Sequence, residues 1–305
     1  MSAVPSASIA DQNASLETRL ARFPAQQVGL ASQRVLSYRE AHGADSAALP
    51  LVLLHGIGSG AASWVQQFEV LGAARRVMAW DAPGYGVSTP VAPESPAAAD
   101  YATVLEAWLD ALGIERCVLL GHSLGAIIAG AFATSWPQRV AGLLLLSPAG
   151  GYGEASAEVR ETKRDQRLAM LNELGPQGLA EKRSANMVSA HASDEARAWV
   201  RWNMARVVPQ GYAQATHLLA NADLASDLAR LDGRLAQPLV QKLALAVGAE
   251  DTITPPAACE LLARAAGTSL QVVPRAGHAG YIEAPAAYTA IIDTFCRDCD
   301  GQRSQ

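Results

Sequence analysis

Four short apolar runs, separated by stretches with helical periodicity, constrain the fold of this chain more than any other sequence feature. The apolar runs lie at residues 51–54, 77–80, 117–120 and 143–146. Each is apolar throughout, without the polar alternation of a half-exposed strand, which is typical of parallel strands covered on both faces. Because helical patterns separate these runs, the sequence predicts an α/β fold with a mostly parallel, doubly wound sheet and right-handed crossovers.

A long helical stretch interrupts this alternation. Residues 151–231 have helical periodicity and no convincing strand, whereas apolar strand patterns return at residues 243–247 and 270–273. Two earlier runs, 26–30 and 35–40, predict an antiparallel hairpin ahead of the main sheet. The predicted organisation is a loose N-terminal lead-in, an α/β core in two pieces and a helical insertion, at residues 1–25, 26–150 with 232–297, and 151–231.

Composition excludes several classes of protein. The chain has 305 residues, of which 50% are hydrophobic, and its formal net charge is −5. This apolar share is too high for a disordered chain, and the acidic balance argues against a nucleic-acid partner. No run reaches the roughly 18 consecutive apolar residues of a membrane span. Since no secretory signal pattern is visible either, we expect a cytoplasmic protein without a membrane partner, and we leave a homo-oligomer open.

The four cysteines indicate neither a disulfide framework nor a metal site. They are sparse for a chain of this length, and the C-x-x-C formed by Cys296 and Cys299 has no second ligand pair. We interpret both as residues of the last helix and its tail. The sequence therefore predicts no metal and no cofactor.

One pentapeptide carries the argument about chemistry. Residues 121–125 read Gly-His-Ser-Leu-Gly and lie between the apolar run 117–120 and a helical pattern. This is the G-x-S-x-G motif in the strand–turn–helix context that it requires. Small flanking residues permit a sharp, strained turn, and the start of a helix offers backbone N–H groups that stabilise negative charge. The motif predicts Ser123 as a nucleophile.

Two partners for this serine follow later in the chain. His278 comes directly after the predicted strand 270–273, and Asp251 comes shortly after the predicted strand 243–247. Loops at the same edge of a parallel sheet can converge, and the order Ser, Asp, His is that of α/β-hydrolase triads. We expect His278 to take the proton of Ser123, and Asp251 to orient the imidazole. Glu250 is the alternative acid.

A glycine-rich segment after the first buried strand predicts an oxyanion hole. Residues 54–60 read Leu-His-Gly-Ile-Gly-Ser-Gly, and the glycines allow the backbone to approach a substrate closely. We expect one donor to be the backbone N–H of Ile57 and the other that of Leu124, the residue after the nucleophile. Gly56 is then expected to contact the substrate.

With these motifs the chain resembles the α/β-hydrolase superfamily from about Gln26 to Phe295. The turn at residues 81–88 and the histidine region at 277–285 are also similar to that family. The resemblance implies the α/β-hydrolase fold, and it implies that the insertion at residues 151–231 is a helical lid.

Within the superfamily, the residues around 55–64 are similar to the oxyanion loop of hydrolases that cleave carbon–carbon bonds in aromatic ring-fission products. Those enzymes usually have asparagine before the nucleophile, whereas this chain has His122, which is closer to esterases and to enol-lactonases of aromatic catabolism. We therefore expect ester hydrolysis first, with enol-lactone hydrolysis or carbon–carbon bond cleavage as the alternatives.

Some residues of the insertion are candidate substrate contacts. Arg183 could pair with a substrate carboxylate in a bidentate fork, although a solvated charge is the simpler interpretation. Trp202 could contact the substrate from the lid, although aromatic residues at helical spacing more often belong to a core. His122 is expected to lie beside the substrate and to orient the loop.

Two other classes of function are weaker alternatives. Gly56-x-Gly58 follows a strand and Asp81 ends the next one, which partly matches a dinucleotide-binding oxidoreductase. A non-catalytic binding protein on the same fold is the other alternative. Neither explains why the serine, histidine and aspartate motifs occur together. The sequence therefore predicts a serine hydrolase acting on a small molecule.

Overall fold

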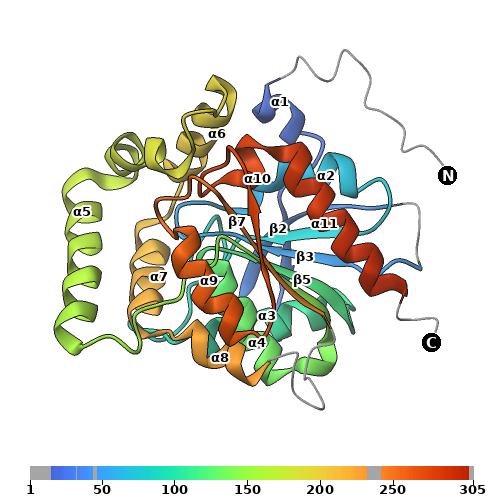
Figure 1. Ribbon diagram of the computed structural model, residues 1–305, viewed down its shortest axis with the longest axis horizontal. Helices are drawn as coiled ribbons and strands as arrows, with labels where there is room; N and C mark the ends of the chain where they lie inside the picture. Colours follow the sequence, from blue (N-terminus) through green and yellow to red (C-terminus); the bar gives the residue numbers. More distant parts are fainter. Residues whose placement is uncertain (1–14, 32, 44–46, 232–241, 302–305) are drawn as a thin grey trace.

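The computed structural model describes residues 15–31, 33–43, 47–231 and 242–301, and an eight-stranded sheet runs through the centre of this part (Figure 1). The strand order is β1-β2-β4-β3-β5-β6-β7-β8. Only β1 and β2 run antiparallel to their neighbours, and all later pairs are parallel. The strands are β1 (Gln26–Gly29), β2 (Val35–Ala41), β3 (Leu51–Leu54), β4 (Val77–Trp80), β5 (Cys117–His122), β6 (Val140–Leu146), β7 (Leu243–Gly248) and β8 (Leu270–Val273).

The four apolar runs form the four central strands. All residues of β3, β4, β5 and β6 are buried, because helices cover both faces of the sheet at these positions. The mostly parallel, doubly wound sheet predicted from the sequence is therefore confirmed. The hairpin before it is also present, with Gln26 of β1 paired to Tyr38 of β2.

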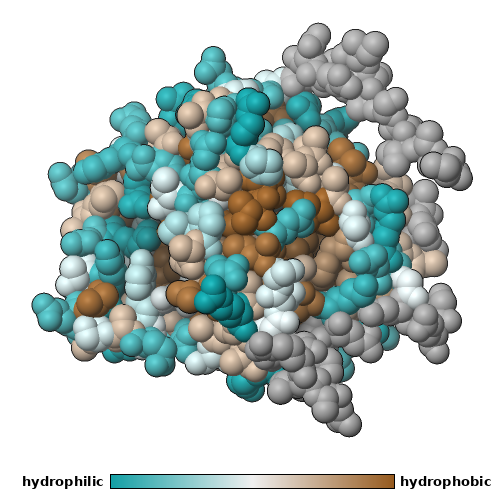
Figure 2. All heavy atoms as spheres, in the orientation of Figure 1, coloured by the Kyte–Doolittle hydropathy of each residue, from teal (hydrophilic) through white to brown (hydrophobic). Residues whose placement is uncertain are grey.

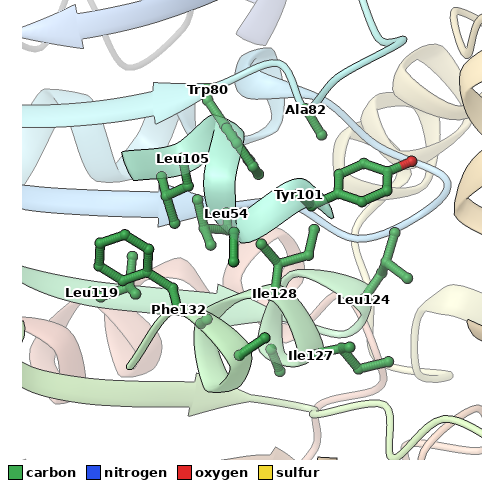
Figure 3. Close-up of a cluster of buried hydrophobic side chains, with 14 of the residues drawn as sticks. Leu54, Trp80, Ala82, Tyr101, Leu105, Leu119, Leu124, Ile127, Ile128 and Phe132 are labelled. Carbon is green, nitrogen blue, oxygen red and sulfur yellow. The ribbon is translucent and has the colours of Figure 1, made fainter. Parts of the chain in front are cut away.

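Helices pack against the two faces of the sheet. One face is covered by α3 (Ala98–Ala111), α4 (Leu124–Ser135) and α9 (Pro256–Ala265), and the other by α2 (Val65–Leu71) and α11 (Pro285–Asp300). Figure 3 shows the core on the first face, where Leu105 of α3 and Phe132 of α4 lie near Leu119 of β5. The apolar periodicity of these helices thus supplies the two halves of the core.

Part of the predicted N-terminal lead-in is helical. Helix α1 (Leu16–Leu20) begins after Ser15, whose hydroxyl accepts a hydrogen bond from the Thr18 amide. Leu16 and Leu20, one turn apart, are both buried. The last part of residues 1–25 is therefore packed against the domain, and residues 1–14 lie outside the described residues.

The insertion contains four helices between β6 and β7. They are α5 (Ala157–Arg183), α6 (Asp194–Met204), α7 (Pro209–Asn221) and α8 (Leu224–Arg230). Helix α5 is broken at Gly175, where φ is 61°, just before Pro176. Helix α8 packs against α4 and α9, so the predicted lid range ends in a helix that belongs with those covering the sheet. Helices α5, α6 and α7 lie to one side of the sheet (Figure 1).

Four short helices complete the described elements: η2 (Ala61–Trp64), η3 (Pro137–Arg139), η4 (Ser184–Met187) and α10 (Gly280–Glu283). Apolar side chains gather near the centre of the face seen in Figure 2. The last strand of the sheet, β8, carries Val272, which is 47% exposed. No helix within the described ranges is long and apolar enough to cross a membrane.

Candidate active site

Ser123 lies on a strained turn between β5 and α4. Its φ is 54° and its ψ is −114°, a backbone conformation with positive φ that residues other than glycine rarely adopt. A Cβ at Gly121 would lie 2.4 Å from the Gly125 carbonyl oxygen, and a Cβ at Gly125 would lie 2.3 Å from that of Leu54. The amide of Ser123 donates to the Leu146 carbonyl of β6 at 3.0 Å, which fixes the turn. The motif thus places Ser123 at the carboxyl edge of the sheet.

His278 and Asp251 form a buried hydrogen-bonded pair. His278 Nδ1 lies 2.9 Å from Asp251 Oδ2, and both side chains are fully buried. The other carboxylate oxygen, Oδ1, accepts the amides of Ile253 and Thr254 at 2.8 and 2.9 Å. Burial alone would raise the pKa of Asp251, but the hydrogen bonds from His278 and Thr254 outweigh it and lower the pKa to about 2. Asp251 is therefore ionised at neutral pH.

The alternative acid, Glu250, lies elsewhere. Its side chain is 38% exposed, and its Oε1 lies 3.0 Å from His191 Nε2. The loop after β7 turns at these residues, since the Asp251 amide donates to the Gly248 carbonyl at 3.1 Å. Asp251, and not Glu250, is hydrogen-bonded to His278.

Thr254, for which no role is predicted from the sequence, is part of the same network. Its Oγ1 lies 2.9 Å from Asp251 Oδ2, 3.2 Å from His278 Nδ1 and 3.1 Å from the Ser147 carbonyl oxygen. The hydroxyl can therefore donate to the carboxylate that orients the imidazole. Its position three residues after Asp251, in the turn that the aspartate caps, is the available sequence signal.

One cavity brings Ser123 and His278 together. It has a volume of about 420 Å³, and both residues line it together with Gly56, Ile57 and His122. His278 Nε2 is buried and has no hydrogen-bond partner among the described residues, so Ser123 does not bond to it in this structure. The imidazole therefore has one nitrogen engaged with Asp251 and the other unoccupied.

The glycine-rich loop packs directly on the serine turn. A Cβ at Gly56 would lie 3.1 Å from both His122 Nδ1 and Ser123 Cβ, so a larger residue would crowd the turn. The Tyr85 hydroxyl donates a hydrogen bond to the Ile57 carbonyl at 2.8 Å, which stabilises the position of the loop. Within the described residues, neither the Ile57 amide nor the Leu124 amide donates a hydrogen bond. Both predicted oxyanion donors are thus unpaired.

His55 and Asp81 hold this loop in place. His55 Nδ1–H donates to the Gly56 carbonyl at 2.8 Å, and its Nε2 accepts the Ala82 amide at 3.0 Å. This arrangement requires a neutral imidazole, and burial lowers the pKa of His55 accordingly. Asp81 accepts the Ala61 amide at 2.8 Å and the Ser37 hydroxyl at 2.6 Å, so both its oxygens are engaged within the protein.

His122 lies between the serine turn and the imidazole of His278. Its Nε2–H donates to the His278 carbonyl at 2.9 Å, and its Nδ1 is buried without a partner among the described residues. Burial, followed by the nearby charge of His278, lowers the pKa of His122 to about 3. His122 is therefore a neutral donor that orients the histidine loop.

This lowered pKa predicts acid sensitivity. The unfolded chain binds a proton at position 122 below about pH 6.5, whereas the folded chain does so only near pH 3, so stability falls as pH decreases across this window. His122→Asn keeps a hydrogen-bond donor but has no group that titrates in this range. Between pH 7 and pH 4.5 we expect its free energy of unfolding to fall by about 2 kcal/mol less than that of the wild type. Urea unfolding at both pH values measures this. The exposed His42→Asn is the control, and equal losses in His122→Asn and the wild type would contradict the assignment.

The inserted helices contribute the other wall of the cavity. Arg183, a candidate substrate contact, lines this cavity. Arg167 lines it too, although its place in a charged run is typical of a solvated helix face. The remaining lining residues from this region are largely apolar: Met187, Val200, Met204, Tyr212 and Leu219.

The prediction for Trp202 is not supported. Trp202 does not line this cavity but stacks on Trp199 with ring centroids 4.5 Å apart, and the Arg206 guanidinium lies 3.6 Å from its ring centroid. Val200 and Met204 of the same helix do face the cavity. Trp202 lies two positions from each of these residues. Two positions along an α-helix correspond to a rotation of about 200°, so Trp202 points to the opposite side of α6.

Comparison with known protein families identifies the family of this chain. A family model described as the alpha/beta hydrolase family matches residues 51–291, which is most of the chain. The protein belongs to the alpha/beta hydrolase family. Among the described residues, no group of three or more histidine, cysteine, aspartate or glutamate side chains is placed to hold a metal ion.

Several relatives are esterases or lipases. The human (lyso)-N-acylphosphatidylethanolamine lipase is 33% identical over 132 residues, which cover 42% of this chain and 39% of that protein. The chain thus spans well under half the length of this relative. A solved structure of a thermophilic esterase from Thermogutta terrifontis, with malate bound, is 26% identical with a TM-score of 0.77, covering 91% of this chain and 99% of that one. An enol-lactonase from Burkholderia xenovorans LB400 shares the fold, at 23% identity and a TM-score of 0.74, covering 88% of this chain and 99% of that one.

Proposed function

We propose that this protein is a serine hydrolase that cleaves carboxylic esters with Ser123, His278 and Asp251. The observation that carries the proposal is the orientation of His278. One ring nitrogen is bonded to a buried, ionised carboxylate, and the other is unpartnered in the cavity that Ser123 lines. This is the arrangement in which an imidazole can accept the proton of a serine hydroxyl.

The reaction follows from these positions. Ser123 Oγ attacks the ester carbonyl carbon while its proton passes to His278 Nε2, and Asp251 stabilises the imidazolium that forms. The negative oxygen of the tetrahedral intermediate accepts hydrogen bonds from the Ile57 and Leu124 amides. The intermediate then expels the alcohol, which takes the proton from His278. Water attacks the acyl-enzyme by the same route, releasing the acid and restoring the serine.

The surroundings favour a small substrate with an apolar part. Helices α5, α6 and α7 act as a lid in this proposal, since they supply the mostly apolar wall of a cavity in the size range of small-molecule sites. The esterase and lipase relatives support ester cleavage. We place Gly56, His122 and Arg183 beside the substrate.

Lactone and carbon–carbon cleavage are the second candidates, since the same three residues can act on other electrophilic carbonyl groups. They are separated from ester hydrolysis by assaying p-nitrophenyl esters of increasing chain length beside an enol-lactone and a vinylogous diketone acid.

Labelling with a serine-directed fluorophosphonate tests the nucleophile. We expect the wild type and Ser59→Ala, which changes another cavity serine, to be labelled, and Ser123→Ala to remain unlabelled. Labelling of Ser123→Ala would refute the assignment.

Thr254 is expected to act as a positioning residue for Asp251 and His278. Thr254→Val keeps the shape of the side chain but removes the hydroxyl that lies 2.9 Å from the carboxylate. We expect kcat to fall about tenfold, the equivalent of one neutral-to-charged hydrogen bond, with KM changed little. Steady-state kinetics across pH 5–9 measure this.

Thr216→Val is the matched control for this effect. Thr216 is also buried, but its hydroxyl donates to the Tyr212 carbonyl of its own helix. We expect its kcat to equal that of the wild type. If Thr254→Val left kcat and its pH profile unchanged, Thr254 would have no positioning role.

A further inference from the structure

We infer that the substrates of this cavity carry an anionic oxygen group, which Arg167 and Arg183 bind while Ser123 attacks the ester carbonyl. The inference rests on the proposed ester hydrolysis and names its substrate class. Both arginines line the same cavity as Ser123 and His278. A guanidinium is the side chain best suited to bind a carboxylate or a phosphate, because its planar fork donates two parallel hydrogen bonds.

The break in α5 places both arginines at one cavity. They are separated by 16 positions in a helix whose only non-helical residue is Gly175. In a straight α-helix this separation would correspond to roughly 24 Å along the axis, too far for both to reach one small-molecule site. The break at Gly175 and Pro176 changes the direction of α5, and each half contributes one arginine to the cavity.

Neither arginine has a carboxylate partner. Within the described residues, Arg167 and Arg183 form no ion pair and no hydrogen bond. Some other enclosed arginines do form ion pairs: Arg19 with Glu69, Arg75 with Asp300 and Arg139 with Asp110. The guanidinium donors of the two cavity arginines are therefore available to a ligand.

The two charges also act on each other. Burial, and then the positive charge of Arg167, lower the pKa of Arg183, whereas Tyr212 and Tyr152 act in the opposite direction. Two unpaired like charges in a partly enclosed site are unfavourable without a counter-ion. A bound anion would relieve this repulsion.

One acidic residue lines the cavity as well. Asp223 Oδ1 accepts the Ser226 amide at 3.3 Å and caps α8, and it forms no ion pair with either arginine. Much of the remaining wall is apolar, including Val200, Met204 and Leu262. The cavity thus combines Ser123, a largely apolar wall and two arginines. This pattern fits an ester whose apolar chain ends in an anion.

Two matched esters test the inference. The p-nitrophenyl monoester of adipic acid and p-nitrophenyl hexanoate have acyl chains of equal length, and only the first ends in a carboxylate. We expect Arg167→Met/Arg183→Met to lose about 100-fold in kcat/KM on the adipate ester and less than about threefold on the hexanoate. Each single variant should lose about tenfold on the adipate ester, mainly through KM.

A control variant at a third arginine distinguishes the loss of charge inside the cavity from a change in the net charge of the protein. Arg201→Met changes an exposed arginine of α6 that does not line this cavity, and we expect it to leave both esters unaffected. Equal losses on the two esters in the double variant, or no loss on the adipate ester, would overturn the inference. Competitive inhibition of p-nitrophenyl hexanoate hydrolysis by adipate and by hexyl phosphate distinguishes a carboxylate from a phosphate as the preferred group.

The outcome also separates this inference from the proposed function. If hydrolysis of the neutral ester requires Ser123 but the charge preference is absent, only the arginine site fails. If neither ester is hydrolysed, the proposed function fails. Calorimetric binding of adipate to the wild type and to the double variant then decides the arginine site alone. Binding that is at least about tenfold weaker in the double variant supports the site, and equal binding overturns it.

Discussion

Ser123→Ala is expected to lower kcat for ester hydrolysis by about 10⁶-fold, the scale found when a protease loses its nucleophile. In the proposed reaction the Ser123 hydroxyl oxygen forms the bond to the acyl group, and no other side chain that lines the cavity is held on the strained turn beside two unpaired amides. Stopped-flow or long-time-course assays with p-nitrophenyl esters measure the residual rate. Circular dichroism of the variant should match that of the wild type. Residual activity within tenfold of the wild type would exclude Ser123 as the nucleophile.

His278 should behave as part of the same unit. His278→Ala is expected to cost a factor similar to that of Ser123→Ala, because the serine then has no base to accept its proton. The double variant should be little slower than either single variant. Losses that multiply would mean that the two residues act in separate steps, which the shared cavity does not suggest.

Gly125→Ala is expected to lower the free energy of unfolding by at least about 3 kcal/mol, the upper range for overpacking a core. A Cβ at this position would lie 2.3 Å from the Leu54 carbonyl oxygen and 2.9 Å from that of His55. Both atoms belong to the backbone, so either β3 or α4 must move. Because β3 leads into the glycine-rich loop and α4 follows Ser123, ester hydrolysis should also fall. Urea unfolding and kcat/KM measure the two effects.

Gly130→Ala provides the control on the same helix. Its Cβ would lie 2.5 Å from Leu224 Cδ1, the end of a side chain that can rotate away. Alanine is also the better helix former by about 1 kcal/mol. We therefore expect a change in stability of less than about 1.5 kcal/mol and normal activity. Equal destabilisation by the two substitutions would show that contact with the backbone is not the cause.

The central sheet was predictable because its strands are buried on both faces. Continuous apolar runs such as 117–120 leave few alternatives, and the glycines around Ser123 permit one kind of turn. The pairing of His278 with Asp251 followed from their places after β8 and β7, since parallel strands bring these loops to one edge. Local patterns were sufficient here because the geometry of the sheet supplies the long-range contacts.

The inserted helices were less predictable. Their sequence shows which residues are apolar, but not which side of each helix faces the sheet, so Trp202 was assigned to the wrong face of α6. Arg167 was missed because it lines the same cavity as Arg183 only through the break in α5 at Gly175, and a basic residue in a charged run does not indicate this. Thr254 was missed because its role depends on a contact with Asp251 within a tight turn.

The position of the insertion has an evolutionary consequence. β6 ends at Leu146 and β7 begins at Leu243, yet the two strands are direct neighbours with Leu146 paired to Ala246. The inserted helices therefore leave the pairing of these two strands uninterrupted. We expect that replacement of α5, α6 and α7 by other helices would change the part of the cavity wall that they supply, and with it the accepted molecule, while β6 and β7 stay paired.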